Sequence, residues 1–366
     1  MQKYAPGRSV FCFRGIITAM RNNNYLTWTI LAGASLLSAG LIVFCYYPFG
    51  LDMEASTGSY AINATRYSSA LDGMPVSRKT ETNPQVVAVM IDNHPDARPQ
   101  FGLAAAKVVY EAPVEGGITR YMAIFDSRQS IAQVGPVRSA RPYFLDWLEE
   151  YGRGVYMHSG GSPDALAQIP QRNIFDANEF YYGGYYWRSS DRQAPHNLYS
   201  KSDLWQSFVE KYATSTDAMP VGSGWKFSAT AAQGGSPQQA VAIYYGGDYV
   251  VSWKYDAKTG NYVRYVNGVK YADAGGSEIR AKNVIVQYAA VSVIDEEGRR
   301  AVATTGGGDA RVLQGGQMIR AVWTKTSVTD RTRFYPASTP GSEIGLLPGA
   351  VWIEVVPKET NVIITN

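Results

Sequence analysis

The stretch Gln85–Ile91, which reads QVVAVMI, is an almost unbroken apolar run and predicts a strand that is buried on both faces. Further along the chain, Lys107–Pro113 and Ile118–Asp126 flank an EGG tripeptide and predict a hairpin. A strand is predicted next at Gly154–His158. Helices are predicted at Arg141–Tyr151, Ser162–Gln168 and Ser202–Tyr212.

This mixed order of helices and strands predicts an α+β or α/β lobe over residues 84–215. Residues 216–239 are rich in Gly, Ser, Ala and Gln and indicate a crossing between lobes. Residues 240–366 alternate short apolar runs with tight turns, which predicts a mostly antiparallel β lobe. The expected fold class is therefore an α+β or α/β first lobe followed by a mostly antiparallel β second lobe, with a single N-terminal transmembrane helix before them.

That transmembrane helix is expected at residues 26–47, which carry no charge and are long enough to cross a bilayer of about 30 Å. Basic residues without an acidic one precede it, so residues 1–25 are expected in the cytoplasm and the bulk of the chain outside the cell membrane. Residues 48–83 read as a flexible tether. A cleaved signal peptide and a lipoprotein at Cys45 are the alternatives, but bulky Phe44 precedes Cys45, and no clear cleavage site follows the run. The true start is either Met1 or Met20.

The composition and the motifs argue against several classes of function. The formal net charge is only +3, so no strongly basic surface argues for nucleic acid. Cys12 and Cys45 are the only cysteines, and both lie in the tail or the expected span, so the outer part folds without disulfides or thiolate metal sites. Neither a P-loop nor a G-x-G-x-x-G motif is present, and no cofactor is expected.

An anion site is predicted around Val134–Phe144, which reads VGPVRSARPYF. It places Arg138 and Arg141 at the start of a predicted helix, where unpaired backbone N–H groups and a partial positive charge favour anions. A second helix start lies in a glycine-rich loop whose backbone could add further donors. That loop consists of Ser159, Gly160, Gly161 and Ser162.

Four residues are candidates for acid–base catalysis. Asp92 follows the first buried strand, where open α/β sheets place functional groups, although an Asx turn before Pro95 explains the same residues. Glu111 is a second candidate, and the expected hairpin would instead pair it with Arg120 as an ordinary ion pair. The remaining candidates are His158 and His196. The three histidines show no close spacing, and no metal site is expected.

Several segments together resemble the YerB-like family of bacterial envelope proteins, a domain family of unknown function. The segments are Val87–Gln100, Val109–Ala112, Glu115–Arg120, Val134–Arg141, Ala194–Asn197, Asp330–Phe334 and Trp352–Val356. The resemblance implies a two-part extracytoplasmic protein, often a lipoprotein, and it supplies no established catalytic residues.

Taken together, the sequence predicts a single-pass envelope protein that binds an anionic cell-wall component or a partner protein at Arg138 and Arg141. The alternative is a hydrolase or transferase that acts on a cell-wall polymer by carboxylate and histidine acid–base chemistry. The expected partners are the membrane, through the chain's own helix, and a wall polymer or envelope protein.

Overall fold

The computed structural model describes residues 67–213, 218–238, 240–339 and 341–365 of the 366-residue chain. The expected cytoplasmic tail, the span at 26–47 and the first part of the tether lie outside these residues. Within the described part, the chain is mostly β-strand with a few short helices. Residues 67–83, the last part of the expected tether, include two short strands, and Leu71 there packs in the hydrophobic core.

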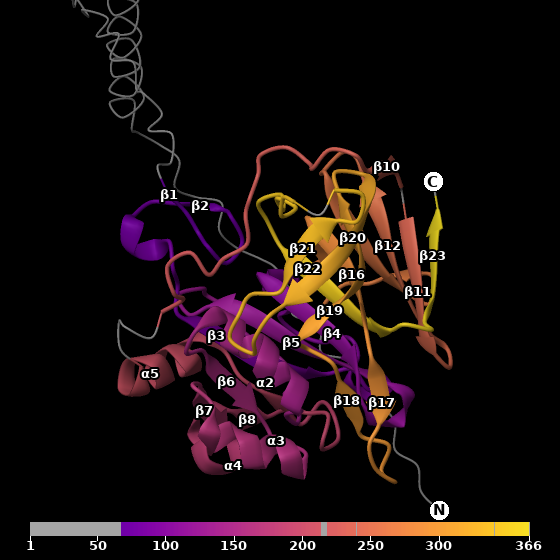
Figure 1. Cartoon of the computed structure of the whole chain (residues 1–366). Helices are drawn as coiled ribbons and strands as arrows, with labels where there is room; N and C mark the ends of the chain where they lie inside the picture. Colours follow the sequence, from indigo (N-terminus) through magenta and orange to yellow (C-terminus); the bar gives the residue numbers. More distant parts are fainter. Residues whose placement is uncertain (1–66, 214–217, 239, 340, 366) are drawn as a thin grey trace, which may run out of the picture. The chain divides into compact units, whose positions relative to one another are not determined.

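One mixed sheet of eleven strands contains segments from both halves of the chain (Figure 1). Ten strands follow the order β10-β20-β19-β16-β22-β4-β5-β3-β6-β7, and β21 additionally pairs with β20. The bounds are β3 Val86–Asp92, β4 Val108–Pro113, β5 Thr119–Asp126, β6 Val155–His158, β7 Phe175–Asn178, β10 Ser236–Pro237, β16 Asn283–Ala289, β19 Gly306–Gln314, β20 Gln317–Lys325, β21 Arg333–Pro336 and β22 Val351–Pro357.

β22 joins the two halves of the chain. It runs parallel to β4 on one side and parallel to β16 on the other, so that Ile353 lies opposite Tyr110 and Ile285. Since β4 belongs to the N-terminal half and β16 to the C-terminal half, both halves share one sheet.

β3 lies near the other end of this sheet, antiparallel to β5 and parallel to β6. All of its residues are buried, as the apolar run predicts, because packed side chains cover both faces of the sheet. Its C-terminal end carries the candidate site.

A second sheet of six strands has the order β14-β13-β12-β11-β23, with β15 paired to β13. Its bounds are β11 Ala240–Gly246, β12 Tyr249–Asp256, β13 Asn261–Val266, β14 Val269–Lys270, β15 Arg280–Ala281 and β23 Asn361–Thr365. Three two-stranded sheets complete the β structure: β1 Tyr67–Ser68 with β2 Pro75–Val76, β8 Trp187–Arg188 with β9 Leu198–Tyr199, and β17 Val291–Val293 with β18 Arg300–Val302.

The helices are short and lie mostly in the N-terminal half. The α-helices are α2 Pro142–Leu148, α3 Pro163–Gln168, α4 Glu179–Tyr182 and α5 Ser202–Tyr212. The 3-10 helices are η1 Lys79–Glu81, η2 Pro95–Ala97, η3 Leu103–Ala105, η4 Glu115–Gly117, η5 Glu149–Tyr151, η6 Ile169–Gln171 and η7 Gly183–Tyr185. Ser162 caps α3 by accepting a hydrogen bond from the N–H of Ala165, as its position before Pro163 predicts.

Two hydrophobic clusters form the core, and β3 contributes to both. Met90 packs in the cluster that contains Trp147 of α2. Val89, which points to the opposite face, packs in the cluster that contains Trp205 of α5 and Trp253 of the six-stranded sheet. Burying each such large side chain stabilises the fold by about 1.5–3 kcal/mol.

The fold-class prediction was wrong. The described chain is mostly β, and one mixed sheet runs through both halves where an α+β or α/β lobe and a separate antiparallel lobe were expected. The apolar periodicity identified the strands, but it carries no information on which strands pair. No helix among the described residues is long and apolar enough to span a membrane.

The hairpin prediction was correct in its strands and wrong in its register. β4 and β5 pair as expected, but Arg120 lies opposite Ala112, and Tyr121 lies opposite Glu111. The turn holds one residue more than the sequence argument assumed, and a one-residue shift moves a side chain to the other face of the sheet. The expected Glu111–Arg120 ion pair is therefore absent, and Glu111 pairs with Arg264 instead.

Candidate functional site

Asp92, the last residue of β3, is a carboxylate that is only 1% exposed. Its Oδ1 accepts a hydrogen bond of 3.0 Å from the backbone N–H of His94, which forms the predicted Asx turn before Pro95 and η2. A buried carboxylate is costly unless donors and positive charges compensate it. Two side chains from distant parts of the chain supply that compensation.

His196 is the first of them. Its Nδ1 donates a hydrogen bond of 2.7 Å to Oδ2 of Asp92. It lies in the loop between β8 and β9, and its side chain remains 14% exposed. Asp92 and His196, two of the four predicted acid–base candidates, are thus in direct contact.

Arg138 is the second. Its Nε lies 3.3 Å from Oδ2 of Asp92, and 30% of the side chain is exposed. The backbone holds it there, because the Arg138 N–H donates to the carbonyl oxygen of Met90 and Val137 forms a bridge with Ile91. The segment that contains Arg138 therefore lies along β3.

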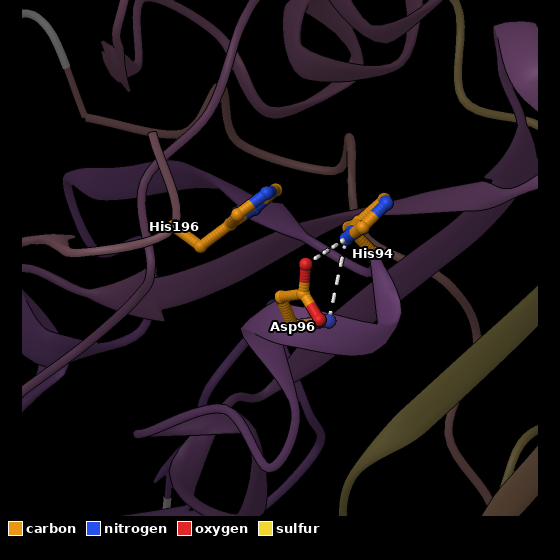
Figure 2. Close-up of side chains that lie close together, drawn as sticks. All are labelled: His94, Asp96 and His196. Atoms are coloured by element: carbon orange, nitrogen blue, oxygen red, sulfur yellow. Dashed lines mark hydrogen bonds and ion pairs between the residues drawn. The ribbon is translucent and has the colours of Figure 1, made fainter. Parts of the chain in front are cut away.

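His94 completes the cluster from the N-terminus of η2. Its ring stacks on the ring of His196, with centroids 4.5 Å apart and planes inclined by 14° (Figure 2). Asp96 lies beside them, with Oδ2 3.5 Å from Nδ1 of His94. The ligating atoms of His94, Asp96 and His196 all lie within 4.8 Å of one another, so this group could hold a metal ion.

This arrangement defines the chemistry that is available. An ionised Asp92 can only accept hydrogen bonds, so Nδ1 of His196 carries a proton and the neutral ring keeps its lone pair on Nε2. Nε2 has no hydrogen-bond partner among the described residues. Such a nitrogen can accept a proton, bind a metal ion or, when protonated, bind an anion.

Arg141, the second arginine of the predicted anion site, is engaged elsewhere. Its guanidinium makes two hydrogen bonds to the carboxylate of Glu115 and a third to the carbonyl oxygen of Ala140. Burial raises the pKa of Glu115, but the hydrogen bonds and charge of Arg141 outweigh it and lower the pKa. The structure therefore places Arg138 and Arg141 in two different ion pairs.

The glycine-rich loop binds mainly to the protein itself. The N–H of Ser159 donates to Arg138, that of Gly160 to the side chain of Asn178, and that of Ser162 to Ala140. Three of the donors expected to face an anion are thus already used.

His158 and Glu111, the other two acid–base candidates, are fully buried. His158 contacts the carbonyl oxygen of Gly160 through Nδ1 and Asp176 through Nε2, both at 2.8 Å. Glu111 accepts hydrogen bonds from Thr119, Tyr249 and Arg264. Both residues hold the fold together and do not reach the Asp92 cluster.

The described pockets lie away from Asp92 and His196. The largest has a volume of about 740 Å³ and lies beside β19 and β20, where Tyr288, Arg311 and Lys358 contribute to its lining. The cluster reaches the surface, because the side chains of His94, Asp96 and His196 are 40%, 74% and 14% exposed.

The sequence argument missed His94 and Asp96 as members of the site, and it missed Arg264 as the common partner of Glu111 and Glu354. The D-N-H-P-D spacing after β3 could have indicated the first pair. A single charge inside an otherwise apolar strand could have indicated the second.

Comparison with known proteins gives consistent matches. Residues 71–224 match the family described as "Protein of unknown function (DUF3048) N-terminal domain", and residues 241–353 match its C-terminal domain. The chain is similar to "Putative lipoprotein YerB" of Bacillus subtilis (strain 168), with 33% identity over 302 residues, which is 80% of this chain and 87% of that protein. A crystal structure of the YerB protein from Bacillus subtilis matches with a TM-score of 0.71 and 30% identity, over 81% of this chain and 100% of that one.

Proposed function

The chain belongs to the DUF3048 family, which confirms the resemblance seen in its sequence, and we propose that it is a membrane-associated extracytoplasmic protein that binds an anionic group of an envelope component at Arg138. The Bacillus subtilis relative is named a lipoprotein, and lipoproteins are held at a membrane surface. From this relative we infer association with a membrane and an extracytoplasmic location, and we infer nothing about the mode of attachment.

The observation that carries this proposal is a pair of guanidinium groups that bind the segment after Asp92 through neutral partners. Arg98 donates to the side chain and carbonyl oxygen of Asn93, and Arg192 donates to the carbonyl oxygens of Ala97 and Pro99. Neither has a carboxylate partner among the described residues. Their charges are therefore available to attract an anion.

A buried cation strengthens the same region. Arg120 is 3% exposed and donates to the carbonyl oxygen of Ser139, next to Arg138. Burial, followed by the nearby charge of Arg141, lowers the pKa of Arg120 to about 10, so it stays protonated at neutral pH. Arg138 is the partly exposed group through which this positive region meets the solvent.

The test is binding of the full chain to purified bacterial sacculi, before and after chemical removal of their phosphate-bearing polymers. We expect Arg138→Gln to weaken binding to the intact sacculi by roughly tenfold or more, because hydrogen bonds to charged groups contribute about 1.5–3 kcal/mol. Arg78→Gln, which changes an arginine that is 77% exposed and bound to Glu81, serves as the matched control. Unchanged binding by a folded Arg138→Gln variant would refute the proposal.

A second candidate function is hydrolysis of a wall polymer with His196 as the general base. The observation that favours it is the 2.7 Å hydrogen bond from His196 to Asp92, since such a carboxylate orients an imidazole for proton transfer. Turnover of sacculi by the native chain that is lost in Asp92→Asn would support it. Binding without turnover favours the first proposal.

A further inference from the structure

His94, Asp96 and His196 bring metal-ligating atoms together at a partly exposed surface (Figure 2). We propose that these three residues form a binding site for a divalent transition-metal ion of the zinc class, with two imidazole nitrogens and one carboxylate oxygen as protein ligands. The site goes beyond the anion-binding function and does not depend on it.

The contact between Asp92 and His196 prepares one ligand. Metal-binding histidines usually donate their second ring N–H to a carboxylate, which fixes the ring and makes the other nitrogen a better ligand. Here Nδ1 of His196 donates to Asp92, and Nε2 is left for the metal. Asp92 is itself held by the N–H of His94, so the two histidines are positioned through one buried carboxylate.

His94 and Asp96 have the separation that two ligands of one ion require. Two ligands that bind an ion at about 2.1 Å each lie roughly 3–3.5 Å apart in tetrahedral geometry. Nδ1 of His94 and Oδ2 of Asp96 are 3.5 Å apart. The same Nδ1 accepts a hydrogen bond from the backbone N–H of Asp96, which the metal ion would replace.

Metal binding also requires the two rings to move. An ion bound by an imidazole lies in the plane of its ring, so the stacked rings of His94 and His196 must tilt apart to share an ion. His94 has the freedom to rotate because its side chain is 40% exposed, whereas His196 is fixed by Asp92. Asp96, 74% exposed, can follow the ion.

The ligand types select the class of metal. Two imidazoles with one carboxylate suit zinc and its neighbours, whereas calcium and magnesium prefer sites made of oxygen atoms. Three protein ligands also leave at least one position open for water or an anion, as in exposed catalytic zinc sites.

The experiment is a titration of the full chain, purified without a histidine tag, with Co²⁺ as a spectroscopic probe and with Zn²⁺ in competition. We expect one equivalent of Co²⁺ to bind with a visible absorption spectrum typical of nitrogen and oxygen ligands, and Zn²⁺ to displace it. A folded chain that shows no saturable Co²⁺ binding would overturn the proposal.

Variants locate the ion. We expect His94→Ala and Asp96→Asn to weaken Co²⁺ binding by roughly tenfold or more, on the scale known for disturbed metal sites. Asp203→Asn removes a carboxylate of similar exposure, 73%, and should bind Co²⁺ like the native chain. Binding that persists unchanged in both His94→Ala and His196→Ala would place the metal elsewhere, for example at Cys12 and Cys45, and overturn the proposal.

The chain offers an internal control because it contains only three histidines. In NMR spectra of the imidazole groups, Zn²⁺ should shift the signals of His94 and His196 and leave those of His158, whose two nitrogens are already engaged.

Discussion

Arg264 and Glu354 form a hydrogen-bonded pair that is completely buried in the core. Nη1 of Arg264 donates to Oε1 of Glu354 at 2.8 Å, and neither side chain is exposed. Nη2 of the same arginine donates to Oε2 of Glu111 at 2.6 Å. One guanidinium therefore serves two buried carboxylates, and it ties β13 of the six-stranded sheet to β22 and β4 of the main sheet.

Replacing Arg264 with methionine should strongly destabilise the fold. The change leaves the carboxylate of Glu111 buried without its cation and takes a donor from Glu354, and breaking a buried ion pair in this way costs about 3–5 kcal/mol. Urea unfolding of the native and variant chains measures the difference. The control is Arg280→Met, which removes partly exposed ion pairs and should cost about 1 kcal/mol or less. Equal losses of unfolding free energy in the two variants would contradict the stabilising role of the buried Arg264.

The stability of the chain should fall as the pH rises from about 5 to about 8, because of Glu354. Burial, followed by the charge of Glu111, raises the pKa of Glu354 from 4.5 to about 8. Between these values the folded chain keeps a proton that the unfolded chain releases, so the free energy of unfolding decreases as the pH rises through this window. Glu354→Gln imitates the protonated form and should remove this decline. A pH dependence of urea unfolding that is identical in both chains would show that another group causes it.

Several local elements of the fold could be predicted from the sequence, and their arrangement could not. The apolar run that forms β3 and the hairpin of β4 and β5 were found because periodicity and turn residues are local signals. β22 lies in the region where short strands were predicted, but its parallel partner β4 lies far away in the sequence. No local sequence pattern encodes that pairing. Without it, the sequence argument predicted two different lobes where the structure has one shared sheet.

The candidate site shows the same limit. Asp92 and His196 were each selected for their residue type and surroundings, but they are 104 positions apart and their contact depends on the whole fold. Glu111 was selected as a candidate acid, yet the structure buries it against Arg264. A titratable residue in a strand therefore indicates either a site or a buried ion pair, and only the packing around it decides between them.

Gly135→Ala should disturb the position of the loop that carries His196. Gly135 has φ +136°, and a Cβ added there would lie 2.7 Å from the carbonyl oxygen of Leu198. Backbone strain of about 1–2 kcal/mol and overpacking of about 1–3 kcal/mol should add up in the free energy of unfolding. Gly116→Ala is the control, because Gly116 also has positive φ but nothing lies within 4 Å of its added Cβ. Urea unfolding should show a clearly larger loss for Gly135→Ala, and a loss no larger than that of Gly116→Ala would refute the predicted clash.

Substitution of Arg138 and of Arg141 should have different effects on stability and on binding. Arg141→Gln removes two hydrogen bonds from Glu115 and should lower the free energy of unfolding by about 1–3 kcal/mol. Arg138→Gln should lower it less, because Asp92 keeps its hydrogen bonds from His196 and from the N–H of His94. Binding to sacculi should follow the opposite order, with the larger loss in Arg138→Gln, whose side chain is 30% exposed while that of Arg141 is 8% exposed. Urea unfolding and sacculus binding of the same two preparations test both orders. A larger binding loss in Arg141→Gln, with unchanged stability, would show that the anion binds at the start of α2.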